Sequence, residues 1–248
     1  KALLLDLTEP EASRRHGTQP FSNKLVLLTG EEGTGKSLWP KAFDHILHER
    51  FGSGGYEHFR VRFNEMLRQY GPYAVATLKT VLDHIRQNEK DGMRTLLHLD
   101  NLEHLIPPYR NSNNSSSPSG LVVVSPTEFT FYQQVVNPVI NEISTFSKEL
   151  GGSSRNVVVI GESRTPYGEL PDGISRGFRR NVSLDSPSIR DLADIFRVQI
   201  NTTRQFAEKT NTDPFEKDIE RHLDRLAQDA RGLNGNDAQK VILTIATH

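Results

Sequence analysis

Eight residues near the start of the chain have the types and spacing of a phosphate-binding loop. The segment Gly30-Glu31-Glu32-Gly33-Thr34-Gly35-Lys36-Ser37 is a complete GxxxxGK[ST] pattern that directly follows the apolar run 24–29. A strand that ends in a glycine-rich turn and continues into a helix directs backbone N–H groups at a phosphate. The lysine of such a loop reaches the β- and γ-phosphates, and the final hydroxyl binds Mg²⁺. The pattern predicts a nucleoside-triphosphate site that extends from Gly30 to Leu38.

A second segment offers a carboxylate at the end of an apolar run. Leu96-Leu97-His98-Leu99 is followed by Asp100 and Asn101. A buried strand that ends in an acid delivers a carboxylate to the metal ion of the nucleotide, which is the Walker B pattern. We therefore expect Asp100 to bind Mg²⁺ together with Ser37. His98 alternates with apolar neighbours, which predicts a residue of the core.

Composition excludes several classes of partner and site. The 248 residues include 30 Lys and Arg, 31 Asp and Glu and no Cys, with a formal net charge of -1. A neutral chain has no overall field that attracts nucleic acid or anionic membrane. The lack of cysteine excludes disulfides and cysteine metal sites and fits an intracellular, cytoplasmic protein. No apolar run approaches the roughly 20 residues of a membrane span, so no membrane insertion is expected.

Short apolar segments alternate with amphipathic ones, which predicts an α/β fold with a parallel sheet flanked by helices. The expected strands are 25–29, 59–63, 95–100, 157–161 and 181–184. The expected helices are 37–50, 74–88, 127–149, 189–209, 215–230 and 236–247. Pro138 should kink or split the third of these helices, because proline removes a backbone donor inside it.

The composition also suggests how the chain is divided. After Pro187 the strand pattern stops and only helical patterns remain. We expect a lead-in segment 1–20, an α/β nucleotide-binding core 21–187 and a small all-helical lid 188–248. The segment 107–120 is rich in Ser and Asn and is predicted to be a mobile surface loop. The first residues lack a signal-peptide layout, which suggests one module of a longer polypeptide.

The order and spacing of these motifs resemble an AAA-type P-loop ATPase module, of the classical AAA clade, from about Phe21 to the end. The phosphate loop and segment 96–100 carry the first half of the resemblance. Segment 156–166 is similar to the strand that ends in sensor 1, which places Arg164 at the sensor position. Segment 170–180 resembles the one that carries arginine fingers, with Arg176 as the match. Segment 226–237 resembles the GxxGxD turn of the family's helical lid.

The resemblance implies a ring, usually a hexamer of identical or different subunits, that holds ATP and Mg²⁺ between neighbours. It also implies an aromatic pore loop that grips a protein or peptide client. Tyr70, in segment 67–73, is the best match to the pore aromatic; the alternative is that it packs the start of the following helix. Gly177 stands where a second finger arginine is common. Arg179 and Arg180 either act on a neighbour's nucleotide or form a solvated basic patch.

Gly71 and Pro72 depart from the family's usual continuation of the pore segment, and several further departures lie in the hydrolytic part. The family places a glutamate directly after the metal-binding acid, and this chain has Asn101 there. An amide can hydrogen-bond a water molecule but cannot accept its proton, so the usual general base is missing. Glu162, at the end of the expected neighbouring strand, or Glu103 would have to replace it. Arg164 stands where the family has a water-orienting asparagine, with Ser163 as a partial substitute.

The sequence therefore predicts an ATP-binding AAA-type module of a protein-remodelling ring, for unfolding or disassembly, with weak or no hydrolysis. Two alternatives remain open. One is a fully active remodeller whose catalytic base has moved to Glu162. The other is a DNA-loading initiator-type ATPase, which the near-neutral charge and the absence of a winged-helix segment after the lid disfavour.

Overall fold

The computed structural model describes residues 24–107, 125–153, 156–207, 215 and 219–247. The chain divides into two compact units. One contains Lys1–Thr29 and Ser37–Ser183, and the other contains Gly30–Lys36 and Leu184–His248. The phosphate-binding loop is thus grouped with the C-terminal helices. The predicted lead-in 1–20 lies outside the described residues, as does the predicted loop 107–120 apart from Pro107.

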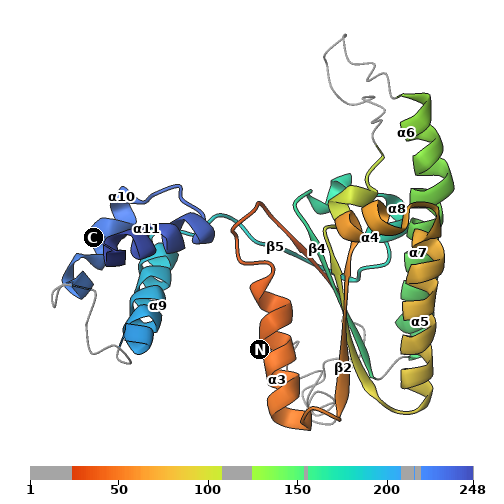
Figure 1. The fold of residues 1–248 in the computed structure, drawn as a ribbon, viewed down its shortest axis with the longest axis horizontal. Helices are drawn as coiled ribbons and strands as arrows, with labels where there is room; N and C mark the ends of the chain where they lie inside the picture. Colours follow the sequence, from red (N-terminus) through yellow and green to blue (C-terminus); the bar gives the residue numbers. More distant parts are fainter. Residues whose placement is uncertain (1–23, 108–124, 154–155, 208–214, 216–218, 248) are drawn as a thin grey trace. The chain divides into compact units, whose positions relative to one another are not determined.

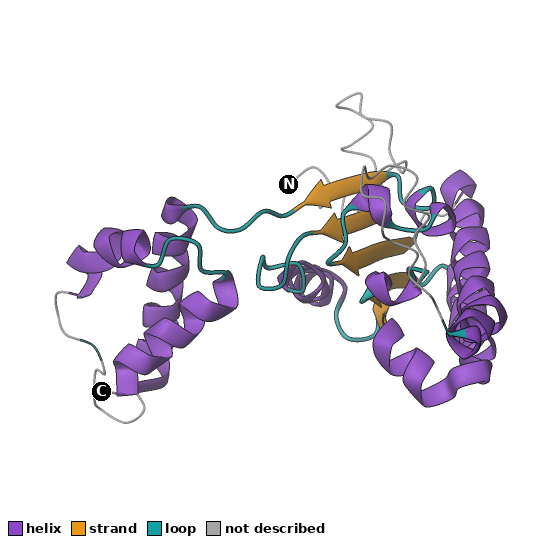
Figure 2. Ribbon diagram, turned by 90° about the horizontal axis from the view of Figure 1, so that it is seen from above, coloured by secondary structure: helices purple, strands orange, loops and turns teal. Residues whose placement is uncertain are grey.

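The first unit is built on a parallel sheet of five strands, in the order β2-β3-β4-β1-β5 (Figure 2). The strands are β1 Leu25–Thr29, β2 Tyr56–Arg62, β3 Arg94–Asp100, β4 Val157–Ser163 and β5 Arg180–Ser183. The central strands β1 and β4 are buried along their whole length, which explains their continuous apolar sequence. The α/β fold class predicted from the sequence is confirmed.

Helices cover both faces of this sheet (Figure 1). They are α3 Leu38–Phe51, α4 Phe63–Tyr70, α5 Ala74–Lys90, α6 Pro126–Phe131, α7 Asn137–Ser153 and α8 Asp172–Ser175, with short turns η1 Gly71–Tyr73, η2 Leu102–Leu105 and η4 Tyr167–Glu169. On one face, Phe43 and Leu47 of α3 pack against β1, β3 and β4. On the other, α4, α5 and α7 bury residues such as Phe63, Leu78 and Ile143. Each face therefore has its own apolar core.

Two local features differ from the expected elements. The predicted strand 59–63 is longer and begins earlier, and an unpredicted helix, α4, starts at Phe63 directly after β2. The predicted helix 127–149 consists of α6, a π-helical segment η3 at Tyr132–Val136, and α7. Pro138 lies in the first turn of α7. The wider π-helical turn before it is a common cause of irregularity in a long helix.

The second unit contains the C-terminal helices α9 Ile189–Ala207, η6 Ile219–His222, α10 Leu223–Asp229 and α11 Gly235–Thr247. Its core contains Leu192, Phe196 and Ile200 of α9, which pack against apolar residues of α10 and α11. Of the predicted helix 215–230, the structure describes a 3₁₀ turn, η6, followed by α10, which ends at Asp229; residues 216–218 lie outside the described residues. The described residues after β5 are helical or loop, as the sequence predicts.

Replacing Phe196 by alanine should selectively destabilise this helical unit. The side chain is fully buried, at 0% exposure. Removing such a phenyl ring leaves a cavity and lowers the free energy of unfolding by about 3–5 kcal/mol. Amide hydrogen exchange in α9, α10 and α11 measures the effect. Val198→Ala is the matched control, because Val198 is on the same helix and 61% exposed. Equal protection in the two variants would contradict this core.

Candidate functional site

The glycines of the phosphate-binding loop have backbone angles that other residues rarely adopt. Gly33 and Gly35 have φ angles of 81° and 89°. A Cβ atom on Gly30 would lie 2.2 Å from the carbonyl oxygen of Leu184, and one on Gly33 would lie 2.4 Å from the Asn234 side chain. The loop therefore requires glycine both for its curvature and for its close packing.

The loop is also hydrogen-bonded to the start of α11. The backbone N–H of Gly235 donates to the carbonyl oxygen of Gly33 over 2.9 Å. Asn234 caps the helix, because its Oδ1 accepts from the N–H of Asp237 over 3.0 Å. Asn234 and Gly235 belong to segment 226–237, which resembles the lid turn of AAA modules. This segment therefore holds the phosphate-binding loop by a backbone hydrogen bond.

Lys36 places its ammonium group inside this loop. Its side chain is buried, and Nζ donates to the carbonyl oxygen of Gly30 over 2.5 Å and to that of Glu31. Nζ also lies 3.4 Å from Oγ1 of Thr34. The side chains of Glu31 and Glu32 are exposed, which reduces their repulsion of an anion through solvent screening. The ammonium group therefore lies within the loop and contacts the loop's own oxygen atoms.

In the first unit, acidic and basic side chains gather where β3 and β4 end. The Ser37 hydroxyl donates to Oε2 of Glu162 over 2.8 Å. Oε1 of Glu162 lies 2.7 Å from Nε2 of His98. Asp100 accepts a hydrogen bond of 2.6 Å from the Arg60 guanidinium. Strand alternation explains the grouping, since His98 and Asp100 lie on one face of β3 and Glu162 lies on the same face of β4.

The predicted magnesium ligands fit that ion by their chemistry. Mg²⁺ prefers oxygen ligands, and Ser37 supplies a hydroxyl while Asp100 supplies a carboxylate. Both side chains already have protein partners, Glu162 and Arg60 respectively. Binding of the ion therefore has to compete with an ion pair at Asp100 and with a hydrogen bond at Ser37.

Asn101 has an unusual backbone conformation at the position where the family carries its glutamate. Its φ and ψ angles are 62° and 46°, and it has the single positive φ among the described non-glycine residues. Asparagine adopts this left-handed region more readily than most residues. The turn η2 begins directly after it, at Leu102.

The other two hydrolytic candidates, Glu103 and Arg164, contact each other. Oε2 of Glu103 accepts from the backbone N–H of Arg164 over 3.2 Å, and Oε1 lies 3.5 Å from the Arg164 Nε. The hydroxyl oxygen of Ser163 accepts from the N–H of Thr165 over 3.0 Å. Glu103 is thus engaged with the residue at the sensor position.

The remaining predicted residues lie on exposed ends of elements. Arg176 follows α8, is 80% exposed and pairs with Asp172 over 2.6 Å. Tyr70 ends α4 and is 39% exposed. Arg179 and Arg180 are exposed at the start of β5. The structure brings Ser37, Asp100 and Glu162 together, but it does not bring Arg176 or Tyr70 into that group.

Sequence reasoning missed the contacts of Arg60 and His98. His98 is buried, as predicted, but its ring meets a carboxylate as well as apolar neighbours. Arg60 lies beside His98 in the register of β2 with β3. In the sequence, the alternation of residues along β2 is the one signal that places Arg60 and His58 on the same face of the sheet.

Burial lowers the pKa of His58, and the attraction of Asp44 opposes that change.

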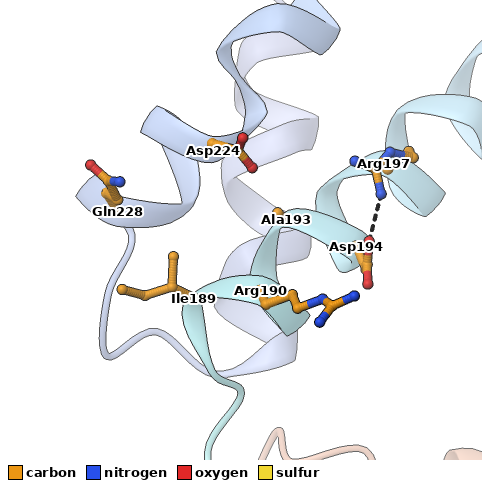
Figure 3. A pocket seen from close by; sticks show the side chains of 7 residues that line it. All are labelled: Ile189, Arg190, Ala193, Asp194, Arg197, Asp224 and Gln228. Carbon is orange, nitrogen blue, oxygen red and sulfur yellow. Dashed lines mark hydrogen bonds and ion pairs between the residues drawn. The ribbon is translucent and has the colours of Figure 1, made fainter.

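The helical unit contains a cavity of about 570 Å³ between α9 and α10 (Figure 3). Its lining residues are Ile189, Arg190, Ala193, Asp194, Arg197, Asp224 and Gln228. Arg197 and Asp194 form an ion pair of 2.5 Å. None of the predicted site residues lines this cavity.

Comparison with known proteins identifies relatives that match most of this chain. A protein of Corynebacterium kroppenstedtii described as an AAA ATPase forming ring-shaped complexes is 29% identical over 204 residues, which cover 79% of this chain and 32% of that protein. A Corynebacterium glutamicum protein of the same description is 28% identical over 231 residues, covering 91% of this chain and 38% of the relative. The chain thus spans about a third of the length of these relatives. No family model matches.

A solved structure has the same fold. The crystal structure of the FIGL-1 AAA domain in complex with ADP matches with a TM-score of 0.63 and 12% identity, covering 99% of this chain and 68% of that one. Among the residues that the structure describes, no helix has the length and apolar character of a membrane span.

Proposed function

We propose that the chain is an AAA ATPase module that binds ATP through Gly30–Leu38 within a ring-shaped complex and hydrolyses it weakly or not at all. The observation that carries the proposal is the phosphate-binding loop. Its glycines have left-handed backbone angles, and its lysine ammonium group is buried inside the loop. These are the features that a polyphosphate requires.

In this proposal each residue of the site has a binding role. Lys36 neutralises the β- and γ-phosphates, and the backbone N–H groups of the loop donate to their oxygens. Ser37 and Asp100 hold Mg²⁺, which supplies further positive charge to the phosphate oxygens when it is bound. Asn234 and Gly235 support the loop from the side of α11. The core 21–187 and the lid 188–248 remain our proposed division of the chain.

Weak hydrolysis follows from the partners of the acidic groups. Attack by water needs a base that orients the water molecule and accepts its proton. Asn101 cannot accept a proton. Glu162 accepts a hydrogen bond from Ser37, and Glu103 accepts one from the backbone N–H of Arg164. A buried carboxylate that already accepts a hydrogen bond is less available to a substrate water.

Ring assembly and a polypeptide client belong to the same proposal. The exposed Arg176 is available to a neighbouring subunit's nucleotide, and the exposed Tyr70 is available to a client in a pore. ATP held between subunits stabilises assembly by mass action even without turnover. The module would then act as a nucleotide-dependent clamp in a remodelling complex.

Three measurements on the same preparation test this proposal: ATP affinity, phosphate release, and particle mass with and without ATP. We expect saturable ATP binding, phosphate release close to the background rate, and a higher mass with ATP. An absence of ATP binding would remove the proposed function. Rapid phosphate release that is abolished in Glu162→Gln would instead establish the active remodeller with a relocated base.

A further inference from the structure

Three side chains, one of which is the proposed magnesium ligand Asp100, form a group that combines an imidazole with two carboxylates. His98, Asp100 and Glu162 are each buried and each offer one ligand atom, and these atoms lie within 4.8 Å of one another. It is the one group of three or more potential metal-ligating side chains found in the described parts of the chain. Asp100 belongs to the proposed magnesium site, but His98 and Glu162 do not.

Two atoms of this group lack hydrogen bonds of normal geometry. His98 Nε2 and Glu162 Oε1 are buried without such a partner, although they approach to 2.7 Å. Both side chains are only 3% exposed, so water does not solvate them. Leaving a buried polar group without a hydrogen bond is destabilising. A ligand that contacts both His98 Nε2 and Glu162 Oε1 would therefore gain binding energy from each of them.

The donor set favours a particular class of ion. Mg²⁺ and Ca²⁺ prefer oxygen ligands only, whereas imidazole nitrogen suits Zn²⁺ and related transition metals. One imidazole and two carboxylates form a set of three protein ligands that Zn²⁺ accepts. Zn²⁺ binds nitrogen and oxygen at about 2.0–2.2 Å, which places tetrahedral ligand atoms roughly 3.4 Å apart. In the observed cluster the ligand atoms lie within 4.8 Å of one another, and the closest pair, His98 Nε2 and Glu162 Oε1, would have to separate from 2.7 Å.

We propose that His98, Asp100 and Glu162 form a binding site for Zn²⁺ or a similar transition-metal ion. Its ligands differ from those of the Ser37–Asp100 magnesium site except for Asp100. The site does not depend on a nucleotide. The two sites share Asp100, so on the proposed function above, occupation by Zn²⁺ would withdraw that carboxylate from Mg²⁺. The guanidinium of Arg60, 2.6 Å from Asp100, competes with either ion.

Titration of the nucleotide-free chain with Zn²⁺, followed by calorimetry, tests the site. Co²⁺ is a second probe, because its visible absorption reports the coordination geometry. We expect one bound ion per chain that millimolar Mg²⁺ does not displace. His98→Leu, which fits the apolar pattern of β3, should weaken Zn²⁺ binding at least tenfold. Arg60→Met should strengthen it, because it removes the competing positive charge.

A matched control separates the site from surface histidines. His45 is 71% exposed and lies beside Glu49, so it offers Zn²⁺ an alternative place to bind. His45→Leu should leave the titration unchanged.

A second variant tests the site if His98→Leu disturbs the fold, as judged by circular dichroism. Glu162→Gln keeps the shape of the side chain and should also weaken Zn²⁺ binding. Equal Zn²⁺ affinity in the folded variants and the parent would overturn the site, as would an absence of Zn²⁺ binding in the parent. ATP binding that persists in either case would leave the proposed function intact.

Discussion

Lys36→Ala should weaken ATP binding by about 10- to 200-fold, because hydrogen bonds to a charged group contribute about 1.5–3 kcal/mol. The physical reason is the position of the ammonium group. It is buried inside the loop, where it now donates to the carbonyl oxygens of Gly30 and Glu31, and a bound phosphate would take over as its partner. The change removes that charge without adding bulk to the loop. Calorimetric titration with ATP and Mg²⁺ measures the effect.

Lys41→Ala is the control for the loss of a positive charge close to the loop. Lys41 is exposed on α3, between the buried residues Pro40 and Phe43. Its replacement should change ATP affinity little, since exposed charges are screened by salt. Unchanged ATP binding in Lys36→Ala, with the fold intact, would refute the assignment of Gly30–Leu38 as a nucleotide site.

Asn101→Glu should raise the rate of phosphate release by about 10²-fold, the lower end of what a general base contributes. The substitution places a carboxylate directly after Asp100, where the family carries its catalytic glutamate. It also has a structural cost. Asn101 has a φ angle of 62°, and the left-handed region costs most residues about 1–2 kcal/mol. A lower melting temperature should therefore accompany the faster release.

Asn101→Gln separates these two effects. Glutamine has the length of glutamate and the same backbone strain, but it cannot accept a proton. It should lower the melting temperature by a similar amount and leave phosphate release at the parent rate. If Asn101→Gln gained as much activity as Asn101→Glu, the missing base would not be the cause of weak turnover. Glu162→Gln should leave phosphate release unchanged, both in the parent and in Asn101→Glu. A loss of release would instead identify Glu162 as the base.

The homology with corynebacterial ring-forming proteins covers far less than their whole length. The chain corresponds to 32% of one relative and 38% of another. The proposals made for it are accordingly those of a nucleotide-binding module. We propose that its loop and sheet supply the groups that bind a triphosphate, and that the groups that would cleave one are replaced or engaged.

The fold was largely predictable because its signals are local. Continuous apolar runs at 25–29 and 157–161 predict strands buried on both faces, and both lie centrally in the sheet. The helix α4 was missed because it has only eight residues and follows a strand without a break. Its sequence, 63–70, contains too few turns for a clear helical period, and the resemblance to a pore segment suggested a loop.

The pattern of the phosphate-binding loop is readable from the sequence alone, because glycine spacing and a following helix are properties of neighbouring residues. The same is true of Asn101, which stands where the family has glutamate. The groups that meet Asp100 and Glu162, in contrast, become visible only in the folded chain. Arg60, His98 and Ser37 come from β2, β3 and the start of α3, and the register of parallel strands brings them together. Such contacts depend on strand order and pairing, which local patterns do not encode.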